Sequence, residues 1–169
     1  MSWIICILIV MIIMICLGSI TISLFKIMNS TIINTERLKI RYERYYNILN
    51  KWIIINDNKL PEYFIKNKIK TIAIYGCGNL GEILFKKLEI TNIEIKYFID
   101  KNSNENFNVF KLEEIKNVTN VDAIVVTPID YYEDIKKEIL KMGYDGIVLP
   151  FDEVILNIYN EVEVDNGGK

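Results

Sequence analysis

The pattern of apolar and charged positions divides this chain into an uncharged apolar start, a helical stretch, and a region of alternating strands and helices. From Trp3 to Phe25 the sequence contains no charged residue. As a helix, this segment would be about 35 Å long, which is enough to cross the hydrocarbon core of a bilayer. Its length and the lack of a small-residue cleavage site favour an anchor over a cleaved signal peptide. We therefore expect residues 1–27 to form a transmembrane anchor that contacts the membrane through residues 3–25.

Residues 28–56 are expected to form an amphipathic linker helix. Its apolar stripe, with alternating spacings of 4 and 3 residues, consists of Leu38, Tyr42, Tyr45, Leu49 and Trp52. The stripe fits one face of a helix but is too short for a stable free coiled coil. Residues 38–52 therefore either pair with a second copy as a homodimer or fold back onto the following domain, which we favour. The segment NDNKLP (56–61) is expected to end the helix.

Residues 57–160 alternate between strand-like and helix-like patterns and predict the α/β fold class. The expected strands are 70–75, 93–100, 122–128 and 146–150, and the run VF (109–110) before the short helix is not assigned to a strand. The expected helices are 79–90, the short segment 111–117, a helix that Asp130 and Glu133 cap and Gly143 ends, and 151–160. Such alternation predicts a single Rossmann-like parallel sheet of four to five strands with helices on both faces. Residues 161–169 are expected to be a flexible tail.

The segment IYGCGNLGEILF (74–85) contains a complete Gly-x-Gly-x-x-Gly between a predicted strand and a predicted helix. In this context Gly76 permits the tight turn, Gly78 lets a pyrophosphate approach the backbone, and Gly81 lets the helix pack against the sheet. The first turn of the helix would offer free N–H groups to phosphates. We therefore predict a cofactor-binding loop for NAD or a nucleotide-sugar, made of Gly76, Cys77, Gly78, Asn79, Leu80 and Gly81.

Two further parts of the chain are expected to face the same ligand. Asp100 ends the next predicted strand and is placed to accept a hydrogen bond from a ribose hydroxyl. Its charge would repel a 2′-phosphate, which favours NAD-like or UDP-sugar-like ligands over NADP, although the neighbouring Lys101 weakens this preference. Thr127 and Pro128, at the carboxyl end of a predicted strand, are expected to line the crevice where the strand order reverses.

The composition narrows the chemistry of this site. The chain has no histidine, which excludes His-based acid–base catalysis and most zinc sites. Cys6 and Cys16 lie in the apolar segment, so the three cysteines form neither a disulfide framework nor a metal-binding spacing. We interpret Cys77 as a small loop residue and not as a nucleophile. We therefore predict no catalytic residue and no metal ligand.

One other motif is interpreted as a coincidence, and the net charge excludes one class of partner. YEDIK (132–136) matches the Tyr-x-x-x-Lys pair of short-chain dehydrogenases, but it directly follows a predicted strand, and its tyrosine lies on an apolar stripe. The net charge of −2 comes without a basic surface, so nucleic acid is not an expected partner.

With the glycine loop, YFIDKN (97–102) and VDAIVVTPI (121–129) in view, the chain resembles a known group of proteins. These are the small Rossmann-like domains encoded with bacterial capsule and other surface-polysaccharide genes, often labelled nucleoside-diphosphate-sugar epimerase-like. The resemblance covers roughly residues 40–158, including YYNILNKW and FDEVI. It implies a nucleotide or nucleotide-sugar site at Gly76, Gly78, Gly81 and Asp100. It does not imply catalysis, because the catalytic pair and substrate-binding half of true epimerases have no counterpart in this sequence.

The flanks of the apolar segment predict its orientation. After it come Lys26, Arg37, Lys39, Arg41, Arg44 and Lys51, against only Glu36 and Glu43. The positive-inside rule then places the carboxyl-terminal part in the cytoplasm. We expect a single-pass cell-membrane protein with a nucleotide-binding, accessory or regulatory role in bacterial surface-polysaccharide biosynthesis, beside glycan-biosynthesis partners. The alternatives are an epimerase- or dehydratase-like oxidoreductase completed by a partner, and a nucleotide-sensing subunit of a transporter.

Overall fold

The structure is a computed structural model that describes residues 2–102, 108–117 and 120–167. The chain separates into two compact units, Met1–Tyr45 and Tyr46–Lys169, which are described separately below. The candidate site lies entirely within the second unit.

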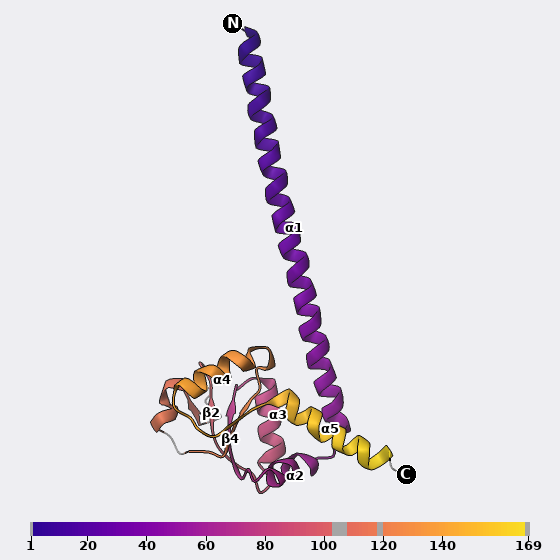
Figure 1. Ribbon diagram of the computed structural model, residues 1–169, viewed down its shortest axis with the longest axis vertical. Coiled ribbons are helices and arrows are strands. Elements are labelled where there is room, and N and C mark those ends of the chain that lie inside the picture. Colours follow the sequence, from indigo (N-terminus) through magenta and orange to yellow (C-terminus); the bar gives the residue numbers. More distant parts are fainter. Residues whose placement is uncertain (1, 103–107, 118–119, 168–169) are drawn as a thin grey trace. The chain divides into compact units, whose positions relative to one another are not determined.

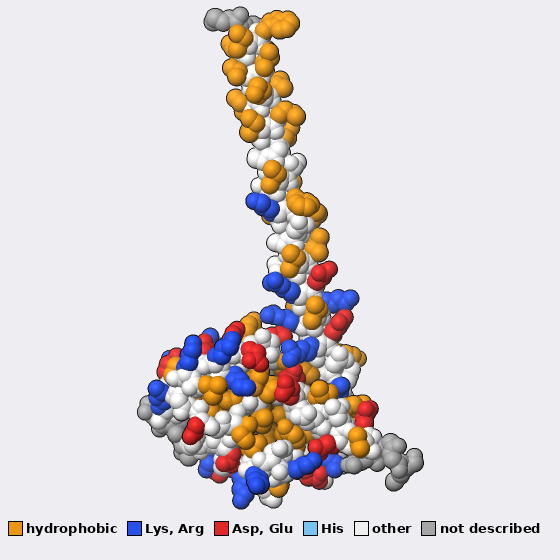
Figure 2. Space-filling model, in the orientation of Figure 1, with side chains coloured by type: hydrophobic (Ala, Val, Ile, Leu, Met, Phe, Trp, Pro, Cys, Tyr) orange, Lys and Arg blue, Asp and Glu red, His pale blue; other side chains and the backbone are white. Residues whose placement is uncertain are grey.

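A single helix, α1 (Ser2–Ile54), contains both the apolar segment and most of the predicted linker helix (Figure 1). Nothing in its backbone marks the predicted boundary between residues 27 and 28. Its amino-terminal part is long and apolar enough to cross a membrane, and its most apolar window has no buried residue. Figure 2 shows this part of α1 covered by apolar side chains without a charged one.

The predicted stripe on α1 divides into an exposed part and a packed part. Leu38 and Tyr42 are 65% and 69% exposed, whereas Leu49 packs against the core of the second unit and Trp52 is buried in it. The Trp52 and Phe151 rings lie with their centroids 4.7 Å apart. The packed residues Leu49 and Trp52 both belong to the second unit.

The second unit is built on one sheet of five strands in the order β3-β2-β1-β4-β5, and every neighbouring pair is parallel. The strands are β1 (Thr71–Tyr75), β2 (Glu94–Ile99), β3 (Val109–Phe110), β4 (Ala123–Val126) and β5 (Ile147–Pro150). The predicted parallel sheet is confirmed. The apolar, β-branched runs of β1 and β4 are buried, as is typical of strands in a parallel sheet.

The helices of this unit differ in detail from the predicted ones. They are α2 (Lys59–Lys66), α3 (Asn79–Leu88), the 3₁₀ helices η1 (Leu112–Asn117) and η2 (Ile129–Tyr131), α4 (Tyr132–Lys141) and α5 (Phe151–Gly167). Helix α2 was not predicted, because it begins inside the polar segment that ends α1. Helix α5 runs past residue 160 and includes most of the segment expected to be a tail, of which residues 168–169 lie outside the described chain.

The predicted cap of α4 by Asp130 is wrong, whereas its predicted end is confirmed. The N-cap of α4 is Tyr131 and makes no side-chain capping bond, because η2 places Asp130 inside a 3₁₀ turn. Gly143 follows the helix with φ +85°, and its N–H donates to the carbonyl of Leu140 at 3.0 Å. This left-handed conformation is the one that glycine adopts without steric cost.

Two apolar clusters form the core, and neighbouring residues of β1 alternate between them. Ile72 and Ile74 belong to a cluster that includes residues of α2, α3, α5 and the end of α1. Ala73 and Tyr75 belong to a second cluster that includes residues of α4 and η1. Since successive side chains of a strand point to opposite faces, the two clusters lie on opposite sides of the sheet.

Candidate nucleotide-binding crevice

The predicted site residues come together at the carboxyl ends of β1, β2 and β4. The chain passes from β1 to β2 on one side, whereas β4 pairs with β1 on the other side. The strand order therefore reverses at β1, and open α/β sheets bind ligands outside the strand ends at such a point. Gly76 follows β1, Asp100 follows β2, and Thr127 follows β4.

Gly76 and Gly81 are needed for close packing of the loop. Gly76 has φ +104°, and a Cβ there would lie 2.5 Å from the hydroxyl oxygen of Thr127. A Cβ on Gly81 would overlap the carbonyl oxygen of Gly76, so the first turn of α3 sits directly on the turn after β1. The roles predicted for these two glycines agree with this geometry.

Gly78 has a different environment. It is exposed, its φ of −78° suits any residue, and a Cβ built there would meet nothing within 4 Å. Gly78 is the N-cap of α3, whose first-turn N–H groups have no partner within the helix. The space above Gly78 and the exposed Asn79 is thus open to an anion, whereas Leu80 is buried in the core.

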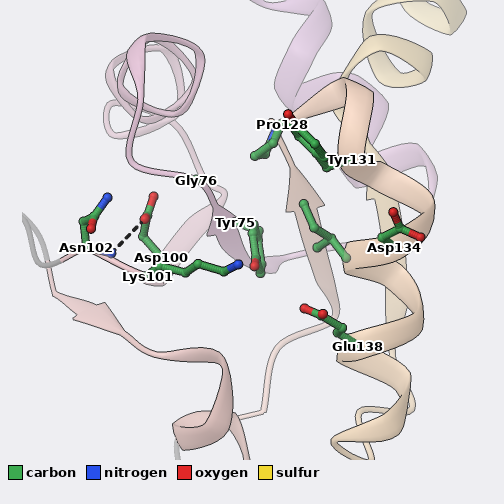
Figure 3. Close-up of a pocket in the computed structure, with 10 residues that line it drawn as sticks. Tyr75, Gly76, Asp100, Lys101, Asn102, Pro128, Tyr131, Asp134 and Glu138 are labelled. Atoms are coloured by element: carbon green, nitrogen blue, oxygen red, sulfur yellow. Dashed lines mark hydrogen bonds between the residues drawn. The ribbon is translucent and has the colours of Figure 1, made fainter.

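Asp100 holds the loop in place. Its Oδ2 accepts a hydrogen bond from the N–H of Cys77 at 2.8 Å. Its Oδ1 accepts one from the N–H of Asn102 at 3.0 Å (Figure 3). Each carboxylate oxygen has two lone pairs, so both can still accept a bond from a ligand. Asp100 therefore combines a structural role with the predicted capacity to accept from a ribose hydroxyl.

Thr127 is buried, and its hydroxyl is already hydrogen-bonded to the backbone. It donates to the carbonyl of Tyr75 at 3.0 Å and lies 3.4 Å from that of Gly76. Thr127 thereby joins the ends of β4 and β1, and the neighbouring Pro128 reaches the crevice surface. Of the two residues predicted here, Pro128 is the one exposed to a ligand.

A cavity of about 350 Å³ opens beside the glycine loop, toward α4. Four predicted residues line it, namely Gly76, Asp100, Lys101 and Pro128. The remaining lining comes from residues that were not predicted, namely Tyr75, Asn102, Tyr131, Asp134, Ile135 and Glu138. The sequence held one sign that α4 residues could line this cavity, because the helix after β4 begins where the strand order reverses. It did not show which face of that helix points toward the cavity.

The side chains that could have been nucleophiles or acid–base groups have other roles. Burial, followed by the charges of Asp100 and Glu82, raises the pKa of the Cys77 thiol to about 11, so it stays protonated near neutral pH. The Tyr132 hydroxyl donates to the carbonyl of Val148 at 3.0 Å, and Lys136 lies over the ring of Tyr132. Within residues 2–102, 108–117 and 120–167, His, Cys, Asp and Glu form no group of three placed to hold a metal ion.

Taken together, the sheet order and the glycine loop define a Rossmann-like α/β domain with a crevice at its strand-order reversal. A family model described as C2185-like, N-terminal matches residues 68–147, which extend from just before β1 to the first residue of β5. No curated protein and no solved structure matches the chain.

Proposed function

We propose that this protein binds a nucleotide, either NAD or a nucleotide-sugar, in the crevice at the ends of β1, β2 and β4. The main support is the glycine loop, in which Gly81 packs on Gly76 while Gly78 leaves open space at the start of α3. A loop of this form places backbone N–H groups and the positive end of the helix dipole next to a pyrophosphate.

The proposed architecture has a layer of helices on each face of the sheet. The division of β1 between an apolar cluster with α3 and α5 and another with α4 supports these layers. The last turns of α1 act as an amphipathic helix, since they turn Ile48 and Trp52 toward the domain.

In this proposal α1 anchors the protein in the cell membrane, and the domain lies in the cytoplasm. The basic residues after the apolar segment favour this orientation. A reporter fused after residue 169 tests it, since an enzyme active only in the cytoplasm should be active there. Activity of a reporter that works only outside the cytoplasm would contradict the orientation.

The biological role that we propose is accessory or regulatory, in bacterial surface-polysaccharide biosynthesis. The resemblance of YFIDKN and VDAIVVTPI to domains encoded with such genes supports it. Deletion of the gene should lower the amount of surface polysaccharide. Expression of the wild-type chain should restore it, whereas a chain with Gly78→Asp should not. An unchanged polysaccharide level after deletion would contradict this role.

Calorimetry of the full chain in lipid nanodiscs tests the binding itself. NAD, NADP, UDP-sugars and AMP are the ligands to titrate, and no heat with any of them would rule out the proposed binding. Gly78→Asp should abolish binding, because its carboxylate would occupy the phosphate space and repel the ligand. Gly78→Ala is the matched control for the fold, since a Cβ at this position meets no other atom within 4 Å.

A further inference from the structure

The cavity beside the glycine loop has an excess of negative charge. Among the described residues that line it, the carboxylates of Asp100, Asp134 and Glu138 stand against one ammonium group, that of Lys101. In Figure 3, Glu138 extends from α4 and Lys101 extends from the end of β2 toward the space beside Tyr75. Helix α4 thus brings to the crevice two carboxylates that the glycine-loop motif does not include.

An adjoining cavity of about 410 Å³ continues this charged region. It shares Tyr75, Asp100, Lys101 and Glu138 with the first cavity and adds one base and one acid, Lys111 and Glu113. Tyr75 is 6% exposed, and the pKa of its phenol is raised first by burial and then by Glu138, Asp100 and Glu113. The negative charges of these three carboxylates therefore influence the same space around the neutral phenol of Tyr75.

No salt bridge within the described part of the chain includes Asp134 or Glu138. Both residues are exposed, so each carboxylate is hydrated and can accept hydrogen bonds from a ligand. A second anionic group placed beside them would be repelled.

We propose that this cavity takes an uncharged ring bearing hydroxyl or amino groups, and that Glu138 and Asp134 reject ligands with a second anionic group there. The inference rests on the proposed nucleotide binding, in which the phosphates lie at Gly78. The carboxylates accept hydrogen bonds from ring hydroxyl or amino groups, and the neutral Tyr75 phenol can donate one. The ring can come from the nucleoside of NAD or from the hexose of a nucleotide-sugar.

Two matched pairs of ligands test this selection with the full chain in nanodiscs. NAD and NADP differ by one phosphate, and UDP-glucose and UDP-glucuronate differ by one carboxylate. In whichever pair binds, the member without the extra anionic group should bind about tenfold more tightly, because like charges near a protein surface repel one another by an energy that corresponds to a ratio of this order. The pair that binds identifies the source of the ring. The preference should shrink as salt is raised, since exposed charges are screened.

Three variants separate charge selection from a structural effect. Glu138→Gln keeps the shape of the side chain and should reduce the preference several-fold, whereas Lys101→Gln should increase it. Glu133→Gln, on the same helix but outside both cavities, is the matched control and should leave the preference unchanged.

The possible results separate this inference from the proposed function. If NADP binds as tightly as NAD, or UDP-glucuronate as tightly as UDP-glucose, the selection is refuted while nucleotide binding stands. The same holds if Glu138→Gln leaves the preference unchanged. If no nucleotide binds at all, both proposals fail together.

Discussion

The carboxylate of Asp100 accepts a hydrogen bond from the backbone N–H of Cys77, with 2.8 Å between oxygen and nitrogen. This bond joins the end of β2 to the glycine loop after β1. It makes the loop conformation dependent on a residue that is 23 positions away in the sequence.

The first prediction concerns this bond. Asp100→Asn keeps one carbonyl oxygen but turns an amide NH₂ toward one of the two N–H donors, so only one of the two bonds can remain. The amide of Cys77 or that of Asn102 should therefore exchange its hydrogen faster in Asp100→Asn, and nucleotide affinity should fall by about tenfold for the loss of one charge-assisted bond. Hydrogen exchange by mass spectrometry measures the first effect and calorimetry the second. Unchanged exchange at both Cys77 and Asn102 would show that the loop does not depend on Asp100.

A second prediction separates the glycines of the loop. Gly81→Ala should lower the free energy of unfolding by about 2 kcal/mol, because its Cβ would overlap the Gly76 carbonyl and separate α3 from the turn. Gly78→Ala should cost about 1 kcal/mol or less, through its weaker capping of α3. Urea unfolding of the full chain in detergent, followed by tryptophan fluorescence, compares the two. Equal losses would contradict the different environments found for these positions.

The third prediction concerns the packed end of α1. Trp52→Ala should lower the free energy of unfolding by about 3–5 kcal/mol, as expected for a large aromatic side chain removed from a core. Its ring is 8% exposed and contacts Phe151. Tyr42→Ala, at an exposed position of the same helix, is the matched control and should change stability by less than about 0.5 kcal/mol. Thermal unfolding followed by circular dichroism suits this comparison, because its signal does not depend on the tryptophan that the substitution removes.

The exposed part of the stripe gives a separate test of the homodimer. A cysteine introduced by Tyr42→Cys, in a chain with Cys6→Ser and Cys16→Ser, should form a disulfide-linked dimer in the membrane if residues 38–45 pair. A chain that stays monomeric under oxidation would remove the homodimer interpretation. The nucleotide-binding proposal would not be affected by that result.

The fourth prediction is a slow reaction at Cys77. Because burial and the nearby carboxylates raise the pKa of its thiol to about 11, little thiolate forms at pH 7.5. The rate of alkylation by iodoacetamide should keep rising with pH up to about pH 11, in a chain with Cys6→Ser and Cys16→Ser. Asp100→Asn should move the curve to lower pH, since one of the two charges that raise the pKa is removed. A plateau below pH 9 would contradict this environment.

The fifth prediction concerns acid stability. Asp122 Oδ2 accepts hydrogen bonds from the N–H groups of Lys70 and Thr71, each at 2.8 Å, and these bonds lower the pKa of Asp122. The folded pKa lies below the unfolded one, so this contribution to stability is present above the unfolded pKa and is lost as the pH falls through the folded pKa.

Asp122→Asn should therefore be less stable than wild type at pH 7. The difference should shrink below about pH 4, where the wild-type carboxylate becomes protonated. Thermal unfolding across this range measures both chains. A difference that grows toward low pH would show that the carboxylate is not stabilising.

The sequence predicted the sheet well because β1 and β4 are nearly continuous apolar runs. TIAIY and AIVV are buried over nearly their whole length, so their pattern reflects the environment directly. The glycine loop was predicted because its Gly-x-Gly-x-x-Gly spacing fits only a few backbone geometries. Strand β3 was not predicted as a strand, because its two residues, Val109 and Phe110, are too few to form a pattern.

Other features depend on contacts that no local pattern contains. The capping motif at Asp130 competes with a 3₁₀ turn whose Ile129 is buried in the core, and the tertiary contact determines where α4 begins. The inward direction of Glu138 follows from how α4 packs through Ile135 and Ile139. The stripe on α1 did not show that Trp52 packs in the core of the second unit, because Phe151, which it contacts, lies 99 residues further along the chain.

The contact between Trp52 and Phe151 also has a consequence for the order in which the domain forms during synthesis. Chains emerge from the ribosome with the amino-terminal end first. Trp52 is therefore made before any strand of the sheet, and Phe151 is made after all of them. This part of the core cannot form until α5 has been translated. Until then, Ile48 and Trp52 at the carboxyl end of α1 stay uncovered in the nascent domain. A truncated product that stops before residue 151 would keep that surface exposed, which makes such fragments natural substrates for chaperones and proteases.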